Sequence, residues 1–348
     1  MIRVKKVQEL DFIRQEMRHY GVAAQLLLRS GSGAEYEITV LPDGAVQITA
    51  ADNSGLLHGV YALAERCGWS FIQPGRDACC PQLKRELPPG SRITASGELL
   101  ARRGVFYDGR ASGVLPEVVD WMGKKRMNIL VCRRKSELAP EIVEMAQQRG
   151  ILIADDVSLF AAANRCVNHT IDEQCCPVNR FWREKILQNR AEKFMIYADY
   201  LESAGETPLI HFDELFCEAE FYFRSGAAGI VMPPEAGRHY WQWMNRFLLA
   251  RSAAGEDKLE TIDRMFTALF GKESFYARRF FAALKDLQLS AGGCGTFNNG
   301  EWIAGVTEAE WEELAGYLDG MTPGSALRCC LSDMRQKKIK LCGLEPDL

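Results

Sequence analysis

Residues 101–153 constrain the fold more than any other stretch, because short apolar runs alternate there with helical patterns. The segments between the runs carry apolar residues at helical spacing, and Pro116 and Pro140 stand where each helix would begin. Apolar strands separated by helices predict a parallel sheet with helices packed against it. The chain is therefore expected to have an α/β fold. The β-prone runs are residues 105–107, 127–132 and 151–153.

Polar residues follow two of these strands directly. Asp108 and Arg110 come after the first strand, and Asp155 and Asp156 come after the third. In parallel sheets and barrels, binding and catalysis take place at the carboxyl ends of the strands, so these residues are candidates for a site. The structural alternatives are an ion pair between Asp108 and Arg110, and an exposed turn or helix cap at Asp155 and Asp156.

The composition sets limits on size and partners. With 348 residues, 47% hydrophobic and 25% charged, the chain can bury a large core and hold two or three structural units. A net charge of −4 without a strongly basic run argues against nucleic acid as a partner. The first ten residues are too polar for a signal peptide, and no apolar run approaches the roughly 18 residues of a membrane span. We therefore expect a cytoplasmic protein with no membrane partner.

Twelve cysteines raise the question of disulfides or a metal. They are scattered along the chain, six of them form three adjacent pairs, and no Cys-x-x-Cys motif occurs. These spacings favour reduced thiols that pack as small apolar side chains. The alternative is a metal site among Cys166, His169, Cys175 and Cys176. We expect no metal and no cofactor.

Three units are predicted along the chain. Residues 1–90 have the pattern of a small α+β domain, whose last part, residues 74–89, is predicted to be a linker. Residues 98–253 are predicted to form a shortened β/α barrel. Residues 254–348 are predicted to form a helical region, which contains a Thr-x-x-Glu capping box at Thr307.

Two segments resemble known enzymes. The sequence DNSGLLHGVYALAERCGWSFIQPG, residues 52–75, resembles the end of the small α+β domain that precedes the catalytic barrel in family 20 and family 67 glycoside hydrolases. The sequence RRGVFYDGRASGVLPEVVDWMGKKRMNIL, residues 102–130, resembles the first strand and helix of the family 20 barrel. The likeness extends to uncharacterised bacterial proteins related to those enzymes. It implies a carbohydrate ligand, with terminal sugars such as N-acetylhexosamine as the substrate class.

The sequence departs from the family pattern in the middle of the barrel. A complete barrel of eight strands takes about 250 residues, whereas residues 101–253 provide about 150. The family active site uses an Asp-Glu pair at a strand end, but no His-x-Gly-Gly-Asp-Glu motif occurs in this chain. In that family the acetamido oxygen of the sugar attacks the anomeric carbon while the paired carboxylates orient it and protonate the leaving oxygen. We therefore expect an incomplete TIM-like (β/α) barrel with fewer than eight strands, and weak or absent hydrolysis.

Several carboxylates remain as catalytic candidates. The stretch Ile210-His211-Phe212-Asp213-Glu214 is the only superficial counterpart of the family pair. Asp213 and Glu214 also suit the first turn of a helix, where the helix dipole favours negative charge. The candidates are Asp155, Asp156, Asp199, Asp213 and Glu214.

The sugar-binding candidates combine strand-end polar groups with the densest aromatic group of the chain. Aromatic faces stack on the apolar face of a pyranose, while carboxylates and arginine bind the hydroxyls. Because residues 241–250 also have helical spacing, core packing is the alternative for one of the two tryptophans. The candidates are Asp108, Arg110, Glu235, Tyr240, Trp241 and Trp243.

Two functions of different classes follow. The first is a glycoside-hydrolase-like protein that acts on or binds carbohydrate and is weak or degenerate in catalysis. The second is a noncatalytic carbohydrate-binding or structural scaffold protein, either a monomer or a homo-oligomer. The missing acid/base motif favours the second function, and the strand-end residues favour some ligand site.

Overall fold

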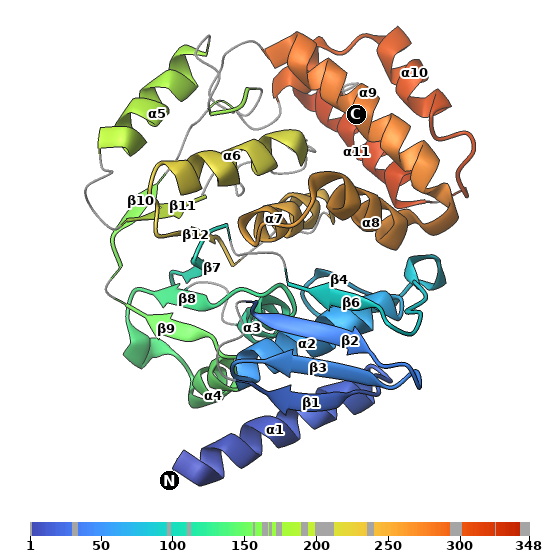
Figure 1. The fold of residues 1–348 in the computed structure, drawn as a ribbon. Helices are drawn as coiled ribbons and strands as arrows, with labels where there is room; N and C mark the ends of the chain where they lie inside the picture. The colour runs from blue at the N-terminus through green and yellow to red at the C-terminus, as the bar shows by residue number, and fades with distance from the viewer. Residues whose placement is uncertain are drawn as a thin grey trace.

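The computed structural model describes residues 2–29, 34–95, 99–109, 113–155, 157–161, 166, 169–171, 176–188, 194–198, 212–234, 240–292, 301–323 and 325–341. Figure 1 shows the N-terminal unit in blue at the bottom, a parallel sheet in the centre, and the C-terminal helices in orange and red at the top right. The structure is a mixed α/β fold, as the strand and helix pattern predicts.

The N-terminal unit is a four-stranded sheet with α2 (Asn53–Arg66) packed against it. Its strand order is β1-β3-β2-β6, in which β2 pairs antiparallel with both β3 and β6. Asp52 caps α2, because its side chain accepts a hydrogen bond from the Gly55 backbone N–H at 2.8 Å. A Cβ on Gly55 would lie 2.3 Å from the Glu35 carbonyl oxygen, so glycine lets α2 approach the sheet closely. The other elements are α1 (Ile2–His19), β1 (Gln25–Leu28), β2 (Tyr36–Val40), β3 (Val46–Ala50) and β6 (Arg92–Thr94).

A two-stranded ribbon follows α2. In it β4 (Trp69–Gln73) pairs antiparallel with β5 (Arg76–Cys79). The indole Nε1 of Trp121 donates a hydrogen bond to the Phe71 carbonyl at 3.0 Å, which ties the ribbon to the helix after β7. The prediction of a linker over residues 74–89 is therefore wrong for its first part. A four-residue strand is stabilised by its pairing partner, which local composition does not encode.

The central sheet has six parallel strands in the order β10-β11-β12-β7-β8-β9. The predicted strands at 105–107, 127–132 and 151–153 are confirmed to within three residues at each end. Across the part of the chain that the structure describes, β9 and β10 are the outermost strands and do not pair with each other. The strands are β7 (Arg102–Tyr107), β8 (Ile129–Cys132), β9 (Leu152–Ala154), β10 (Leu159–Ala161), β11 (Met195–Tyr197) and β12 (Gly229–Met232).

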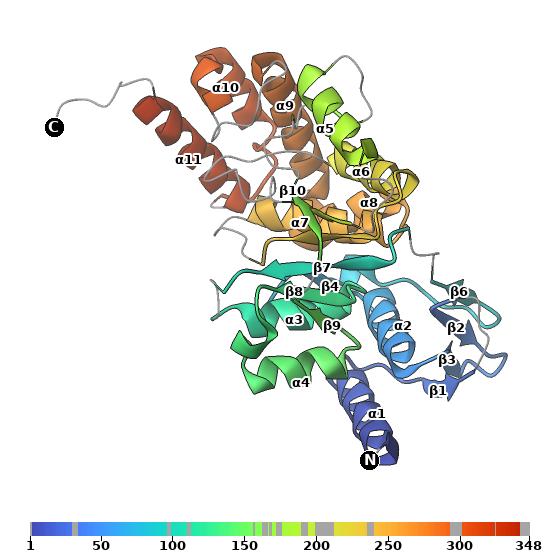
Figure 2. The same cartoon turned by 90° about the vertical axis from the view of Figure 1, so that its left-hand side faces the viewer.

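The two faces of this sheet have different surroundings. Strand side chains alternate between faces, and the set that includes Val105, Leu130 and Ile230 belongs to the main hydrophobic core. Side chains of many helices join that core, among them four helices that Figure 2 shows around the sheet. The other face carries a smaller cluster formed by Ile129, Val131, Met195 and Val231. The helices are α3 (Leu115–Lys124), α4 (Pro140–Gln148), α6 (Phe212–Arg224) and α7 (Tyr240–Ala253).

Buried ion pairs join the N-terminal unit to the rest of the molecule. Glu65, near the end of α2, accepts a hydrogen bond from the Lys125 ammonium at 3.0 Å and is also ion-paired with Arg251. Lys125 is fully buried, and Glu65 is 7% exposed. Burial raises the pKa of Glu65, but the cations of Arg251 and Lys125 outweigh it and hold the pKa below its usual range. The network therefore holds a charged carboxylate inside the protein.

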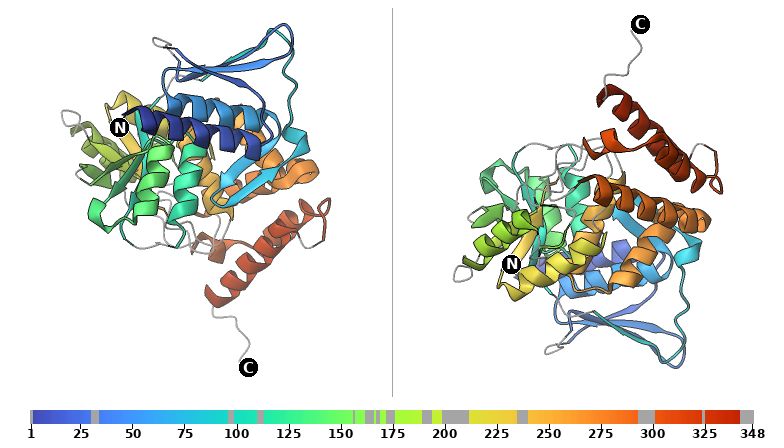
Figure 3. Two further views of the ribbon diagram at one scale, coloured as in Figure 1. Left: turned by 90° about the horizontal axis from the view of Figure 1, so that it is seen from below. Right: turned by 90° about the horizontal axis from the view of Figure 1, so that it is seen from above.

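The described residues that follow α7 are mainly helical. The Thr307 hydroxyl and the Glu310 carboxylate form the predicted capping box at the start of α10. Figure 3 places α10 and α11 on the side of the molecule opposite the β1-β3-β2-β6 sheet. Among the described helices, none combines the length and apolar character that a membrane crossing requires. The remaining helices are α5 (Pro177–Gln188), α8 (Lys258–Phe270), α9 (Ser274–Gly292), α10 (Glu308–Gly316) and α11 (Ala326–Leu341).

Candidate functional site

The carboxyl ends of the parallel strands form the first candidate region. Asp108 follows β7 and is half-buried, whereas Asp155 follows β9 and is exposed. The Asp155 carboxylate accepts a hydrogen bond from the Lys135 backbone N–H at 3.3 Å. This contact and the exposure of the residue fit the turn alternative for Asp155. Four predicted site residues, Arg110, Asp156, Asp199 and Glu235, lie outside the described residues.

An aromatic pair lies on the sheet face opposite the main core. The rings of Phe106 and Tyr197 meet edge to face, with their centroids 5.2 Å apart. Both side chains are half-buried and pack against the smaller cluster. Phe106 is the penultimate residue of β7 and Tyr197 the last residue of β11, so the pair lies near the carboxyl ends of its strands. We did not predict these two residues, although strand alternation places Phe106 on the face opposite Val105 and Tyr107.

The predicted tryptophan site has a different environment. Trp243, in the first turn of α7, is half-buried and packs edge to face against Trp121, with ring centroids 5.5 Å apart. The Arg246 guanidinium lies 5.2 Å from the centroid of the Trp243 ring. These contacts fit the core-packing alternative for Trp243, and its role in binding sugar stays a prediction. Tyr240 and Trp241 also belong to α7, but their side chains are outside the described part of the structure.

The carboxylate pair Asp213 and Glu214 lies in the first turn of α6, as the helix-start alternative predicts. Asp213 is ion-paired with Lys258 at 3.0 Å, and Glu214 with Lys285 at 2.7 Å. These lysines belong to α8 and α9, so both carboxylates face the helical layer. A pocket of about 410 Å³ lies beside them, and its lining includes Phe212, Phe266, Arg278 and Phe281. Here the pair holds helices together, and its catalytic role stays a prediction.

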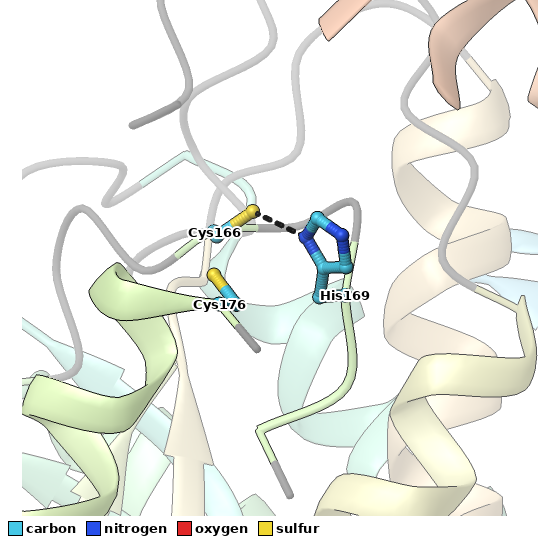
Figure 4. A group of neighbouring side chains, drawn as sticks. All are labelled: Cys166, His169 and Cys176. Atoms are coloured by element: carbon cyan, nitrogen blue, oxygen red, sulfur yellow. Dashed lines mark hydrogen bonds between the residues drawn. The ribbon is translucent and has the colours of Figure 1, made fainter. Parts of the chain in front are cut away.

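A cluster of sulfur and nitrogen atoms lies in the connection from β10 to α5. Candidate ligand atoms of Cys166, His169 and Cys176 all lie within 4.8 Å of one another. The Cys166 Sγ is 3.3 Å from the His169 Nδ1, and Figure 4 shows the three side chains gathered around one point. Three of the four residues that the sequence offered as an alternative metal site are thus close together. Cys175 lies outside the described residues.

Comparisons with solved structures find glycoside hydrolases. One of them is a family GH115 4-O-methyl-α-glucuronidase with specificity for decorated arabinogalactans, which matches at 10% identity and a TM-score of 0.50. The match covers 96% of this chain and 67% of the glucuronidase chain. A GH138 enzyme targeting pectin rhamnogalacturonan II matches 91% of this chain at 12% identity and a TM-score of 0.46. A mutant Streptomyces plicatus β-hexosaminidase matches 64% of this chain at 15% identity and a TM-score of 0.31.

These likenesses concern the fold. The chain spans 58% of the length of both the GH138 enzyme and the β-hexosaminidase. No protein-family model and no curated protein matches the chain. At 10% identity, the likeness to the α-glucuronidase shows a shared mixed α/β fold.

Proposed function

We propose that this protein binds carbohydrate at the carboxyl edge of its parallel sheet and has weak or absent glycosidase activity. The observation that carries the proposal is the half-buried ring pair of Phe106 and Tyr197, which lies near the carboxyl ends of β7 and β11. In the same sheet, Asp108 follows β7 and Asp155 follows β9. Aromatic faces bind the apolar side of a sugar ring, and carboxylates accept hydrogen bonds from its hydroxyls. A terminal sugar such as an N-acetylhexosamine offers an apolar ring face and hydroxyls to groups of this kind.

We propose further that residues 98–253 form an incomplete β/α barrel related to those of glycoside hydrolases, between an α+β domain at 1–90 and the helical region 254–348. In a barrel, helices cover the outer face of the wall and the strands alone line the inside. The distribution of helix side chains between the two sheet faces supports this arrangement. On this view the ring pair of Phe106 and Tyr197 is on the inner face.

The expectation of weak catalysis is supported by the positions of the described carboxylates. A glycosidase needs two carboxyl groups on either side of the scissile bond, about 5 to 9.5 Å apart. Substrate-assisted enzymes replace one of these with the acetamido group but still need a proton donor at the leaving oxygen. Asp213 and Glu214, the only adjacent pair of the predicted candidates with both members described, are held by lysines of α8 and α9. Both members of this described pair are therefore engaged in ion pairs, which favours weak turnover.

Binding is tested by thermal shift and calorimetry with a panel of free sugars that includes N-acetylglucosamine, galactose and glucuronic acid. We expect one class of sugar to raise the Tm of the wild-type protein. Phe106→Leu should abolish the rise, because leucine keeps the apolar volume but not the flat aromatic face. The matched control is Phe223→Leu at an exposed ring on α6, which should keep the rise. An unchanged response of Phe106→Leu would contradict this placement of the site.

Activity is tested separately with a panel of aryl glycosides, including 4-nitrophenyl N-acetylglucosaminide. We expect turnover to be near background. Robust turnover that is lost in Asp155→Asn or Glu214→Gln, but kept in Glu312→Gln at an exposed position on α10, would overturn the expectation of weak catalysis. A protein that neither binds any sugar nor turns over any glycoside would support the scaffold alternative.

A further inference from the structure

We propose that Cys166, His169 and Cys176 form a zinc-binding site in the connection between β10 and α5. The geometry is close to what zinc requires. With Zn–S near 2.3 Å and Zn–N near 2.0 to 2.1 Å, tetrahedral ligands lie about 3.5 to 3.8 Å from one another. The Cys166 Sγ and His169 Nδ1 are 3.3 Å apart, and all three ligand atoms lie within 4.8 Å. Side-chain shifts of about 1 Å would therefore complete the coordination.

One buried side chain fixes the backbone of the site. Asn179, on the first turn of α5, is fully buried, and its Oδ1 accepts a hydrogen bond from the Cys166 backbone N–H at 2.9 Å. Its Nδ2 donates to the carbonyl oxygens of Cys166 and His169, both at 2.9 Å, and of Thr170 at 3.2 Å. A single asparagine thus holds two ligand-bearing residues against the helix that begins directly after Cys176. Groups that orient metal ligands in this way are a regular part of metal sites.

The start of α5 suits a negatively charged sulfur. Cys176 directly precedes the helix, and its Sγ accepts a hydrogen bond from the Asn179 backbone N–H at 3.5 Å. Backbone N–H groups at a helix N-terminus favour negative charge. Both cysteine side chains are fully buried, so their binding as thiolates needs a positive charge beside them. A zinc ion supplies that charge, whereas His169 is half-buried and leaves a route for the ion from solvent.

Cys₂His ligation supplies three of the four positions of a tetrahedral zinc ion, so the fourth is available to water or to another oxygen, nitrogen or sulfur donor. The site follows β10 on the carboxyl side of the sheet, as the proposed sugar-binding edge does. Zinc binding rests on the three ligands alone, and it holds whether or not the protein binds carbohydrate.

The test is the metal content of the full-length protein, purified under reducing conditions with zinc in the medium and measured by inductively coupled plasma mass spectrometry. We expect about one zinc per chain. Cys166→Ser and Cys176→Ser should each lose the metal. The matched control is Cys132→Ser, at another buried cysteine, whose serine hydroxyl can replace the thiol that contacts the Ala154 carbonyl. This control should keep the zinc.

A second measurement avoids dependence on variants that fail to fold. After removal of zinc from the wild-type protein, added Co²⁺ should give thiolate-to-metal charge-transfer absorption and the intense visible bands of tetrahedral cobalt. Asn179→Ala should keep these bands but weaken metal affinity by about 10- to 100-fold in chelator competition, because it loosens the ligands without removing one. Wild-type protein that neither retains zinc nor gives thiolate–cobalt bands would overturn the proposal. A Cys166–Cys176 disulfide that persists under reducing conditions would also overturn it.

Discussion

The junction around Glu65 and the carboxyl edge of the parallel sheet both carry carboxylates, but their surroundings differ. Glu65 is buried and ion-paired with Lys125 and Arg251. Asp155 is exposed and accepts a hydrogen bond from one backbone N–H. The carboxylate of Glu65 is committed to holding α2 against the helices that follow the sheet. The comparison teaches that a buried, ion-paired carboxylate fixes the packing of two parts of the molecule, whereas the region proposed for a ligand carries an exposed carboxylate.

The aromatic residues differ in a similar way. Trp121 is 2% exposed, donates its indole N–H to the Phe71 carbonyl and packs against Trp243. Phe106 and Tyr197 are half-buried and lie on the opposite face of the sheet. Trp121 is therefore part of the core and Trp243 packs against it, while Phe106 and Tyr197 pack against the smaller cluster, where we propose the sugar site.

The largest effect is expected from breaking the junction. Glu65→Gln would leave Lys125 buried without the carboxylate that pairs with it, while Arg251 keeps Glu256, and breaking a buried ion pair typically costs about 3–5 kcal/mol. Chemical denaturation measures the loss in unfolding free energy. Glu260→Gln is the control, because its ion pair with Arg85 is half-exposed and worth about 1 kcal/mol or less. Equal losses in the two variants would contradict the structural role of the junction.

Acid should weaken a second ion pair between the N-terminal unit and the rest of the molecule, formed by Glu35 and Arg126. Burial raises the pKa of this carboxyl group, but its contacts with His58 and Arg126 lower it from 4.5 to about 2. Since the folded-state pKa is depressed, the stabilisation is present above about pH 4.5 and is lost as the pH falls towards 2. The shift corresponds to about 3 kcal/mol.

The measurement is the unfolding free energy of wild-type protein and Glu35→Gln across this pH range. The difference between them should shrink as the pH falls, whereas Glu312→Gln should follow the wild type throughout. A constant difference between wild type and Glu35→Gln would show that the carboxylate charge is not the cause.

A smaller effect on stability is expected at the aromatic pair. Phe106→Leu should cost about 1 kcal/mol, because the side chain is half-buried and leucine fills much of its volume. Denaturation of the sugar-free protein checks this value. A loss as large as that of Glu65→Gln would show that Phe106 has a structural role and would argue against the proposed site at this ring.

The smallest effect is expected at the strand end. Asp155→Asn keeps an oxygen that accepts the hydrogen bond from the Lys135 backbone N–H, so stability should change by about 0.5 kcal/mol or less. The same change should weaken binding of any sugar that raises the Tm, and Glu137→Gln, at a nearby exposed carboxylate, should not. Unchanged sugar affinity in Asp155→Asn would remove this residue from the proposed site.

Local patterns determined much of the architecture. The apolar runs after Ala101 and the prolines that begin α3 and α4 predicted the alternation of strands and helices, because side-chain period and helix-start signals act within a few residues. The capping box at Thr307 was predicted for the same reason. By contrast, the short strands β5 and β10 were missed, since each is stabilised mainly by the strand beside it.

Tertiary structure alone decided which distant residues meet. The sequence contained Glu65, but its partners Lys125 and Arg251 lie 60 and 186 residues further along the chain. It offered Cys166, His169 and Cys176 as a metal-site alternative, yet the packing of α5 places Asn179 where it holds the first two beside the third. Local sequence sets the direction of a side chain, whereas its neighbours depend on how strands and helices pack across the whole fold.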